Sequence, residues 1–341
     1  MGNDNDAVRW QKPIALKGGI SRMEVLQRRH HIKRAVRDYL DGQGFIEIDA
    51  PLLVHGASPD ICIDSFKVED RYLVSSTEYQ LKRMEMAGFK RLYSLTKNFR
   101  HEDKSSVRNP EFTMLEWARV DGTMRDIEND AEYMVNDALD ALKMLPVVSY
   151  QGRKINLKAP WDRIPVLEAV ERITGGAMKD FEVSSCLKAV EVAGLEIKPE
   201  WKDDRDFLFS LLMDHIQPKL GEDCPVFLTE WPLFQTPSAS GDGADSALAC
   251  RSELFIAGLE LADGFAAQTD ADTQTRLFND ALALRKKEGK NAVDLDEKYL
   301  AAMRIGSPCG PGMALGFDRL VMLLCDQSEI KNVLAFGWDE V

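Results

Sequence analysis

The hydrophobic positions near the start of the chain follow two different periods. Ser21 and Glu24 form a capping-box pattern at the start of the first of these segments, and residues 41–44 (Asp-Gly-Gln-Gly) end it. Between them the apolar residues recur at the spacing of an amphipathic helix, at Ile32, Ala35, Val36, Tyr39 and Leu40. Residues 45–48 (Phe-Ile-Glu-Ile) then alternate like a strand, up to Pro51. The pattern therefore predicts a helix over 21–40 that is followed closely by a strand.

Further along the chain, strand and helix patterns follow one another without a regular repeat. The predicted order is strand 72–74, helix 78–87, a hairpin of strands 91–95 and 112–117, a largely helical region 123–220, strands 226–230, 253–260 and 313–316, and helix 319–324. The Gly-, Ser-, Ala- and Asp-rich segment 235–249 is predicted to be a mobile loop. Sheet segments with an inserted helical region favour an α+β fold over a doubly wound parallel one. We expect residues 1–20 to be disordered or extended, and residues 21–341 to form a single domain with a helical insertion at about 123–220.

Composition narrows the class of protein. A chain of 341 residues with 45% hydrophobic content can bury one large core. The absence of an 18-residue apolar run predicts no membrane-spanning helix, and the acidic N-terminus argues against a signal peptide, so we expect a cytoplasmic protein. The six cysteines include no C-x-x-C pair, which indicates reduced thiols rather than a zinc ribbon. The net charge of −13 opposes the phosphate backbone of a nucleic acid, and it favours a basic protein partner over tRNA.

Two segments about two hundred residues apart carry the candidate chemistry. Residues 99–112 hold Arg100 and Arg108, and residues 312–319 (Gly-Met-Ala-Leu-Gly-Phe-Asp-Arg) end in Arg319. In residue type, spacing and order these segments resemble motifs 2 and 3 of class II aminoacyl-tRNA synthetases, most closely those of the lysyl branch. The helix, strand and proline of residues 21–51 resemble motif 1, which builds the dimer interface in that family. The resemblance implies the class II catalytic fold, an antiparallel sheet flanked by helices, in a homodimer.

The resemblance also implies the chemistry, which is adenylation of an amino acid. Negative charge builds up on the α-phosphoryl group of ATP as the carboxylate attacks, so a fixed cation there lowers the barrier. Arg100 is the candidate for the α-phosphate and Arg319 for the γ-phosphate, and these two are the candidate catalytic residues. Glu102 and Asp103 are candidates to meet adenine or metal-bound groups. The other ATP-binding candidates are Phe112 as a stacking ring, Arg108, Asn109 and Glu253.

Glu253 and Glu260 are the candidate metal ligands. Their hard oxygen ligands suit Mg²⁺, which bridges phosphates, and the resemblance to lysyl-type synthetases implies a metal role for both. Seven residues apart on one strand, they would point to opposite faces, and a bulge at Gly258 could restore a common face.

Several segments resemble the amino-acid site of the lysyl branch. Residues 76–83 (Ser-Thr-Glu-Tyr-Gln-Leu-Lys-Arg) resemble the family's Pro-Glu-Leu-Tyr-Leu-Lys-Arg segment, in which the glutamate, here Glu78, meets the substrate amino group. The aspartyl and asparaginyl relatives have glutamine there, so Glu78 indicates the lysyl side. Residues 56–58 (Gly-Ala-Ser) resemble the loop that passes over the amino acid. The candidate substrate residues are Gly56, Ser76, Glu78, Glu116, Ala118, Asp263, Phe265, Ala267 and Ala314.

Two of these positions depart from the family pattern. Asp263-Gly264-Phe265-Ala266-Ala267 aligns with Asn-Gly-Phe-x-Glu, so the glutamate that meets the side-chain ammonium of lysine is Ala267 here. Ala118 likewise replaces a tyrosine. Loss of a carboxylate that pairs with a buried ammonium typically costs about 3–5 kcal/mol, enough to change the preferred substrate. The sequence does not decide between α-lysine, β-lysine and another amino acid.

The layout of the chain suggests a protein acceptor. Only about twenty residues precede the motif 1 segment, too few for the anticodon-binding OB domain of a lysyl-tRNA synthetase. The chain resembles the free-standing paralogues that are elongation factor P–(R)-β-lysine ligases, which also have alanine at the position of Ala314. The resemblance implies ATP and Mg²⁺ as cofactors, and transfer of a lysine-like amino acid to a lysine of elongation factor P. Two alternatives stay open, an activating enzyme for another amino acid and acceptor, and a non-catalytic amino-acid sensor, although a sensor has no need of Arg100 and Arg319.

Overall fold

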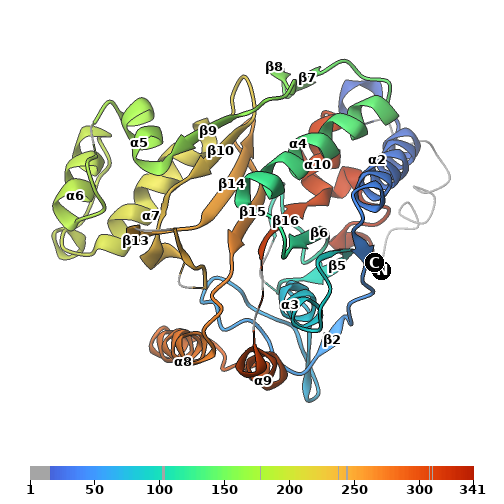
Figure 1. Ribbon diagram of the computed structural model, residues 1–341. Coiled ribbons are helices and arrows are strands. Elements are labelled where there is room, and N and C mark those ends of the chain that lie inside the picture. Colours follow the sequence, from blue (N-terminus) through green and yellow to red (C-terminus); the bar gives the residue numbers. More distant parts are fainter. Residues whose placement is uncertain are drawn as a thin grey trace, which may run out of the picture.

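An eight-stranded sheet forms the centre of the molecule (Figure 1). The computed structural model describes residues 16–101, 104–176, 178–236, 238–242, 245–306, 308 and 310–341. The strand order is β1 (Ile46–Glu47), β5 (Arg91–Phe99), β6 (Glu111–Arg119), β16 (Pro311–Gly316), β15 (Leu259–Ala266), β14 (Arg251–Ile256), β10 (Val226–Thr229) and β9 (Asp162–Pro165). Neighbouring strands from β5 to β10 are antiparallel, while β1 and β9 add parallel pairs at the two edges. This mixed sheet flanked by helices confirms the predicted α+β class.

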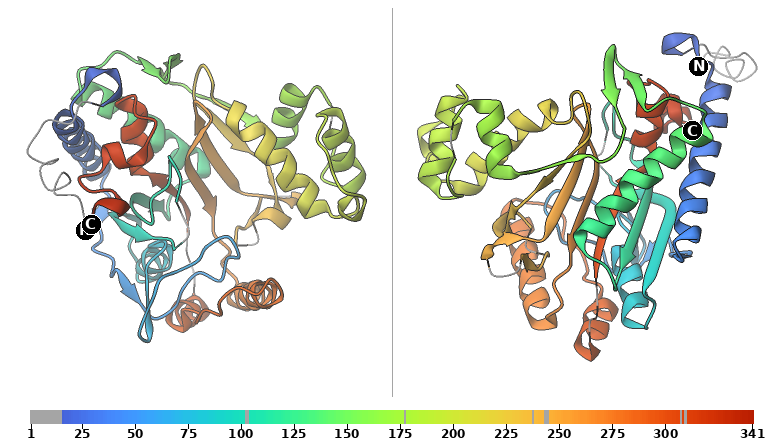
Figure 2. Two further views of the ribbon diagram at one scale, coloured as in Figure 1. Left: turned by 180° about the vertical axis from the view of Figure 1, so that it is seen from behind. Right: turned by 45° about the horizontal axis from the view of Figure 1, so that its top comes forward.

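Alternation along the central strands separates the core from the opposite face of the sheet. Leu115 and Trp117 of β6, and Met313 and Leu315 of β16, are buried in one hydrophobic core. The helices that cover this core are α2 (Arg22–Gly42), α4 (Met124–Ala141) and α10 (Phe317–Leu324) (Figures 1 and 2). Because successive side chains of a strand point to opposite faces, the residues between these apolar ones face away from the core.

The first helix and strand appear where the pattern predicts them. The side chain of Ser21 accepts a hydrogen bond from the backbone N–H of Glu24 at 3.2 Å and so caps α2. Val25, Ile32, Val36 and Leu40 of this helix are fully buried. Of residues 1–20, which we predicted to be disordered or extended, residues 1–15 lie outside the described part of the chain.

A second group of elements lies at the opposite end from α2 and α4 (Figure 1). Helix α3 contacts α9, which contacts α8, and Tyr79 of α3 stacks on Tyr299 of α9 with ring centroids 4.7 Å apart. The bounds are α3 (Glu78–Met86), α8 (Ala271–Lys287), α9 (Glu297–Ile305) and the small sheet of β2 (Leu53–Val54), β4 (Arg71–Leu73) and β3 (Lys67–Val68). Short 3₁₀ turns lie at Lys17–Gly19, Pro199–Trp201, Gln217–Lys219, Leu233–Gln235, Ile330–Val333 and Trp338–Glu340.

The region 123–220 is less helical than predicted. After α4 the chain forms three strands, β7 (Val147–Tyr150), β8 (Arg153–Asn156) and β9, the last of which joins the central sheet beside β10. These strands are only four residues long and lie among prolines, so their alternation is too short to stand out. The helical insertion itself is α5 (Val166–Thr174), α6 (Val183–Val192) and α7 (Arg205–Ile216), which share a separate hydrophobic core with β10 and extend beyond the β9 edge (Figure 1).

Two further predictions of local structure are wrong. Residues 253–260 form a hairpin rather than one strand, because Ala257 and Gly258 have φ values of 56° and 76° and reverse the chain between β14 and β15. The segment 235–249 contains two strands, β12 (Gly241–Asp242) and β13 (Asp245–Ala249), which pair with each other and with β11 (Trp231–Pro232). Its small polar residues gave no strand signal.

Candidate active site

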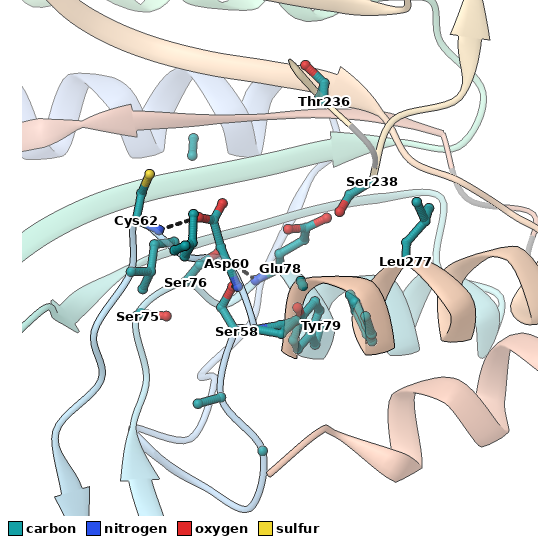
Figure 3. Close-up of a pocket in the computed structure, with 18 of the residues that line it drawn as sticks. Ser58, Asp60, Cys62, Ser75, Ser76, Glu78, Tyr79, Thr236, Ser238 and Leu277 are labelled. Atoms are coloured by element: carbon teal, nitrogen blue, oxygen red, sulfur yellow. Dashed lines mark hydrogen bonds between the residues drawn. The ribbon is translucent and has the colours of Figure 1, made fainter. Parts of the chain in front are cut away.

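A cavity of about 620 Å³ opens on the face of the sheet that points away from the α2 and α4 core. Its walls come from α3, α8, α9 and the loop 56–63, and its floor from β6, β15 and β16. Figure 3 shows Glu78 and Tyr79 of α3, Ser58 and Asp60 of the loop, and Leu277 of α8 around it. Residues from 54 to 80, from 234 to 299, and single residues such as Arg100, Met114 and Ala314 therefore meet at this cavity.

Two cross-strand rows of residues cross the sheet at the cavity, and Arg251, Asp263, Phe265 and Ala314 of these rows line its floor. The first row is Glu253, Asp263, Ala314 and Glu116, which face one another in register on β14, β15, β16 and β6. The second row lies two residues further along each strand and is Arg251, Phe265, Gly312 and Ala118. Residues two apart on a strand share a face, so the sheet brings most of the candidate amino-acid residues together, although they are up to 200 positions apart in sequence.

Glu116 holds the start of α3. One of its carboxylate oxygens accepts a hydrogen bond from the Ser76 hydroxyl at 2.5 Å, and the other accepts from the backbone N–H and the hydroxyl of Thr77 at 2.7 and 2.5 Å. Glu116 is 5% exposed, and its burial raises its pKa, which the bonds from Ser76 and Thr77 oppose. Since Glu78 follows directly, this anchor fixes where Glu78 enters the cavity.

Glu78 is one of the carboxylates that line the cavity, and it lies near Ser76 (Figure 3). Burial raises the pKa of Glu78 to about 7, and Lys82 partly opposes that rise. The nearby carboxylates of Glu116, Glu85 and Asp263 add to it. This cluster of carboxylates favours a cationic ligand, because a bound ammonium group would relieve the repulsion that raises the pKa of Glu78.

Arg251 connects the two rows of the floor. Its guanidinium donates to Asp263 at 2.9 and 3.1 Å, forms a short ion pair with Glu253, and donates to the Thr236 hydroxyl at 2.8 Å. It also lies over the ring of Trp231. Burial raises the pKa of Glu253 well above its ordinary value, although Arg251 opposes that shift.

Arg100 lies where β5 ends, on the cavity side. Its backbone N–H donates to the carbonyl of Pro110 at 2.9 Å, which closes the β5–β6 loop, and its guanidinium lies 5.3 Å from the centroid of the Phe112 ring. In the same loop the side-chain NH₂ of Asn109 donates to the backbone carbonyl of Glu111, and its side-chain oxygen accepts from the backbone N–H of Trp338. A cation beside an aromatic ring is the arrangement that suits a phosphate next to a stacked base.

Arg319 lies near the start of α10 and reaches the other two segments of the site. Its guanidinium donates to the Glu260 carbonyl at 2.5 Å and lies 3.9 Å from the Glu260 carboxylate, and it approaches the Val107 carbonyl at 3.5 Å. The adjacent Asp318 accepts from the backbone N–H of Thr113 at 2.7 Å. These bonds place Arg319 beside both the β14–β15 hairpin and the Arg100 loop.

The residues predicted to hold metal fit a nucleotide-bound Mg²⁺ better than a site made by protein alone. Among the described residues there is no group of three or more His, Cys, Asp or Glu side chains suited to a metal ion. One carboxylate oxygen of Glu253 is buried without a hydrogen-bond partner in the described structure, while Glu260 keeps a 41% exposed side chain. Mg²⁺ commonly takes one or two carboxylates and completes its shell with substrate phosphates and water, so this donor set fits.

Two candidates differ in how closely they approach the cavity. Gly56 lines it, and a Cβ there would lie 2.3 Å from the backbone nitrogen of Asp296, so only glycine lets the loop pass this close to α9. Ala267 is 4% exposed and borders neither this cavity nor a smaller one beside it, because it lies just beyond β15, paired with Ala239. Glu102 and Asp103 lie outside the described residues.

Sequence reasoning missed Arg251, Lys82 and Glu85. Lys82 and Glu85 are 4% and 1% exposed. Their spacing is a signal for Lys82 and Glu85, because they lie four and seven residues after Glu78 and so share its face of α3. Charged residues on a short helix are usually solvated, so nothing in the sequence indicated that this face is buried.

Comparison with known proteins decides the family. The model of the family "tRNA synthetases class II (D, K and N)" matches residues 16–340. The chain belongs to this class II synthetase family. The central sheet is accordingly the class II catalytic fold.

Curated proteins similar to this chain include lysine–tRNA ligases of several bacteria. That of Pelotomaculum thermopropionicum is 35% identical over 323 residues, which are 92% of this chain and 63% of the relative. That of Carboxydothermus hydrogenoformans is 33% identical over 316 residues, 90% of this chain and 64% of the relative. That of Chromohalobacter salexigens is 31% identical over 345 residues, 98% of this chain and 67% of the relative. The chain thus spans a little less than two thirds of the length of the first two relatives.

Proposed function

We propose that the protein activates an amino acid with ATP. The substrate carboxylate attacks the α-phosphorus, the bond to the β-phosphate oxygen breaks, and aminoacyl-adenylate and pyrophosphate form. The observation that carries this proposal is that Arg100 lines the cavity while Arg319 approaches the Val107 carbonyl in the loop that follows Arg100, in a chain of the class II synthetase family. Charge that develops on the phosphoryl oxygens is stabilised most effectively by cations that the fold already holds in place.

The ATP site in this proposal lies between the β5–β6 loop and the β14–β15 hairpin. Phe112 offers its ring to adenine, Arg100 its guanidinium to the α-phosphate, and Arg319 its guanidinium to the γ-phosphate. Glu253 and Glu260 would hold Mg²⁺, which supplies charge neutralisation on the phosphates. Support for Glu253 comes from its buried carboxylate oxygen, which lacks a hydrogen-bond partner among the described groups.

The amino acid in this proposal is lysine-like. Glu78 binds the amino group near the substrate carboxylate, and the carboxylates of Asp263 and Glu116 keep the floor acidic. Ala314 faces Asp263 and Glu116 across the strands and lines the cavity between them. An added methyl there, relative to glycine, supports a substrate with a shifted amino group such as β-lysine.

The acceptor in this proposal is a lysine side chain of elongation factor P. Its amine attacks the adenylate carbonyl, AMP leaves, and an amide forms with loss of one proton. The net charge of −13 and the alanine at position 314 support a protein acceptor. The second candidate, an activating enzyme for another amino acid and acceptor, is favoured by Ala118 and by the withdrawn position of Ala267.

Amino-acid-dependent exchange of pyrophosphate into ATP tests the activation step. The panel should contain α-lysine, both β-lysine enantiomers, ornithine, norleucine and the remaining proteinogenic amino acids. Exchange with a lysine isomer is expected. Exchange with a neutral amino acid alone would support the second candidate, and no exchange with any member of the panel would end the proposal of an activating enzyme.

A further inference from the structure

A small chamber of about 70 Å³ adjoins the main cavity. The two spaces share Ser76, Glu78, Asp263, Phe265 and Ala314 in their walls. The chamber alone adds residues from the interior of α3 and from β6, namely Leu81, Lys82, Glu85, Glu116, Trp117 and Ala118. A volume of this size holds more than one water molecule, so it can accept the end of an aliphatic chain.

One face of α3 borders both the main cavity and the chamber. Glu78, Lys82 and Glu85 are spaced i, i+4 and i+7, which places them in one row. Glu78 borders both spaces, whereas Glu85 borders only the chamber. Seven residues of helix correspond to a rise of about 10.5 Å. That span accommodates an amino group, a short aliphatic chain and a terminal ammonium, with one hydrogen bond of about 2.9 Å at either end.

The bonding of Glu85 leaves its carboxylate able to accept a further cation. Glu85 is 1% exposed, and Lys82 lies 3.4 Å from both of its oxygens. Charge-assisted hydrogen bonds are usually about 2.7–2.9 Å long, so this ion pair is loose. The Lys82 ammonium donates its shorter hydrogen bond, of 2.8 Å, to the carbonyl of Gly310. A buried carboxylate with one distant partner is incompletely compensated.

The other chamber carboxylates are already engaged. Glu116 accepts from Ser76 and Thr77, and Asp263 accepts from Arg251. Ala118 lies across the chamber on β6, and its small side chain leaves the path to Glu85 open. Four carboxylates line the chamber against one ammonium, that of Lys82, which favours a cationic guest over an anionic one.

We propose that Glu85 is the residue that sets specificity for the substrate side chain, by accepting its terminal ammonium while Glu78 holds the α-amino group. Glu85 thereby replaces, from α3, the carboxylate that Ala267 does not provide. This inference rests on the proposed amino-acid site, and it assigns to that site a residue on an element other than the sheet.

Binding calorimetry without ATP tests the proposal directly. L-lysine and L-norleucine have the same chain length, but only lysine carries the terminal ammonium. The wild-type protein is expected to bind lysine more tightly than norleucine. Glu85→Gln is expected to weaken lysine binding at least tenfold and to leave norleucine binding unchanged. Glu288→Gln makes the same substitution at an exposed position at the end of α8 and should bind both ligands as the wild type does.

Two further variants keep the test decisive if Glu85→Gln does not fold. The double variant Lys82→Met/Glu85→Gln leaves no unpaired buried charge, and it should bind lysine and norleucine alike. Glu85→Asp withdraws the carboxylate by one methylene and should shift the preference from lysine toward homolysine. Wild-type lysine affinity in either Gln variant, or no preference for lysine in the wild type, would overturn the proposal. Pyrophosphate exchange by the wild type, measured separately, reports on the activating function, so the two failures are distinguishable.

Discussion

At the scale of single residues, the site sets a few buried guanidinium groups against a larger number of carboxylates. Arg251 bonds Asp263, Glu253 and Thr236, whereas Arg100 and Arg319 lie beside the β5–β6 loop, where we propose that ATP binds. The bonds of Arg251 hold the strands of the cavity floor together. Arg100 and Arg319 provide the positive charge that the proposed reaction needs.

Arg100→Ala and Arg319→Ala are each expected to lower the rate of pyrophosphate exchange by two or more orders of magnitude, because each removes a cation from a phosphate in the transition state. Thermal melting should change little. Arg153→Ala, which removes an exposed arginine of β8 that pairs with Glu222, is the matched control and should exchange at the wild-type rate. Near-normal exchange in either site variant would mean that its arginine does not contact the nucleotide.

Glu78 should make amino-acid binding depend on pH. Its pKa is raised from 4.5 to about 7, so the folded protein takes up a proton between these values. The stability associated with that proton is fully present below pH 4.5 and is lost as the pH rises through about 7. Binding of an ammonium needs the ionised form. Affinity should therefore fall about tenfold per pH unit below 7 and level off above it.

Calorimetry across this pH range measures the effect, and two buffers of different ionisation enthalpy detect the released proton. Glu78→Gln should bind weakly and without this pH dependence. An unchanged profile in Glu78→Gln would assign the titration to another group.

At the scale of elements, α3 joins the proposed amino-acid site to the sheet. Its first turn is fixed by Glu116 of β6 through Ser76 and Thr77, and its inner face carries Glu78 and Glu85. A mutation that displaces this helix should therefore weaken binding of the amino acid and leave binding of ATP unchanged.

Thr77→Ala removes a buried hydroxyl that donates to Glu116, which should lower the free energy of unfolding by about 1–3 kcal/mol. It should raise the KM for the amino acid several-fold and leave the KM for ATP unchanged. Thr123→Ala removes the N-cap of α4 on the other side of the sheet, and it should cost about 1 kcal/mol with both KM values unchanged. Denaturant unfolding and exchange kinetics measure these quantities, and equal KM effects in the two variants would contradict a specific role for α3.

The elements differ in how well the sequence predicted them. Helix α2 and the β5–β6 hairpin carry long periodic patterns with clear ends, and both were predicted. The turn at Ala257–Gly258 was missed because alanine is rarely the residue with positive φ in a tight hairpin turn. Strand β9 was missed because its four residues gain their stability from pairing with β10, which is a tertiary contact.

The site shows the same division. Arg100, Arg319 and Glu78 lie in segments whose family resemblance fixes their positions. Glu85 lies outside these segments, and its proposed role depends on a chamber that α3 and β6 form together. Ala267 shows the opposite case, since its alignment suggested a direct role but the end of β15 keeps it away from both spaces.

At the scale of the whole molecule, charge bears on the choice of partner. The chain carries 56 acidic and 43 basic side chains, excluding histidine, for a net charge of −13. Such a balance repels the phosphates of a nucleic acid at long range and favours basic protein surfaces. None of the described helices is long and apolar enough to cross a membrane.

The acceptor can be identified from the chemistry of the product. Incubation with ATP, Mg²⁺ and a radiolabelled lysine isomer, together with elongation factor P or total tRNA, should label the protein and not the nucleic acid. An amide on a lysine side chain survives mild base, whereas an aminoacyl ester on a tRNA ribose does not, so base treatment distinguishes the two products. Replacement of the acceptor lysine of elongation factor P by arginine should abolish the label, since that side chain is a poor nucleophile at neutral pH. A base-labile label on tRNA would instead identify the chain as part of a tRNA-charging enzyme and would refute the protein acceptor.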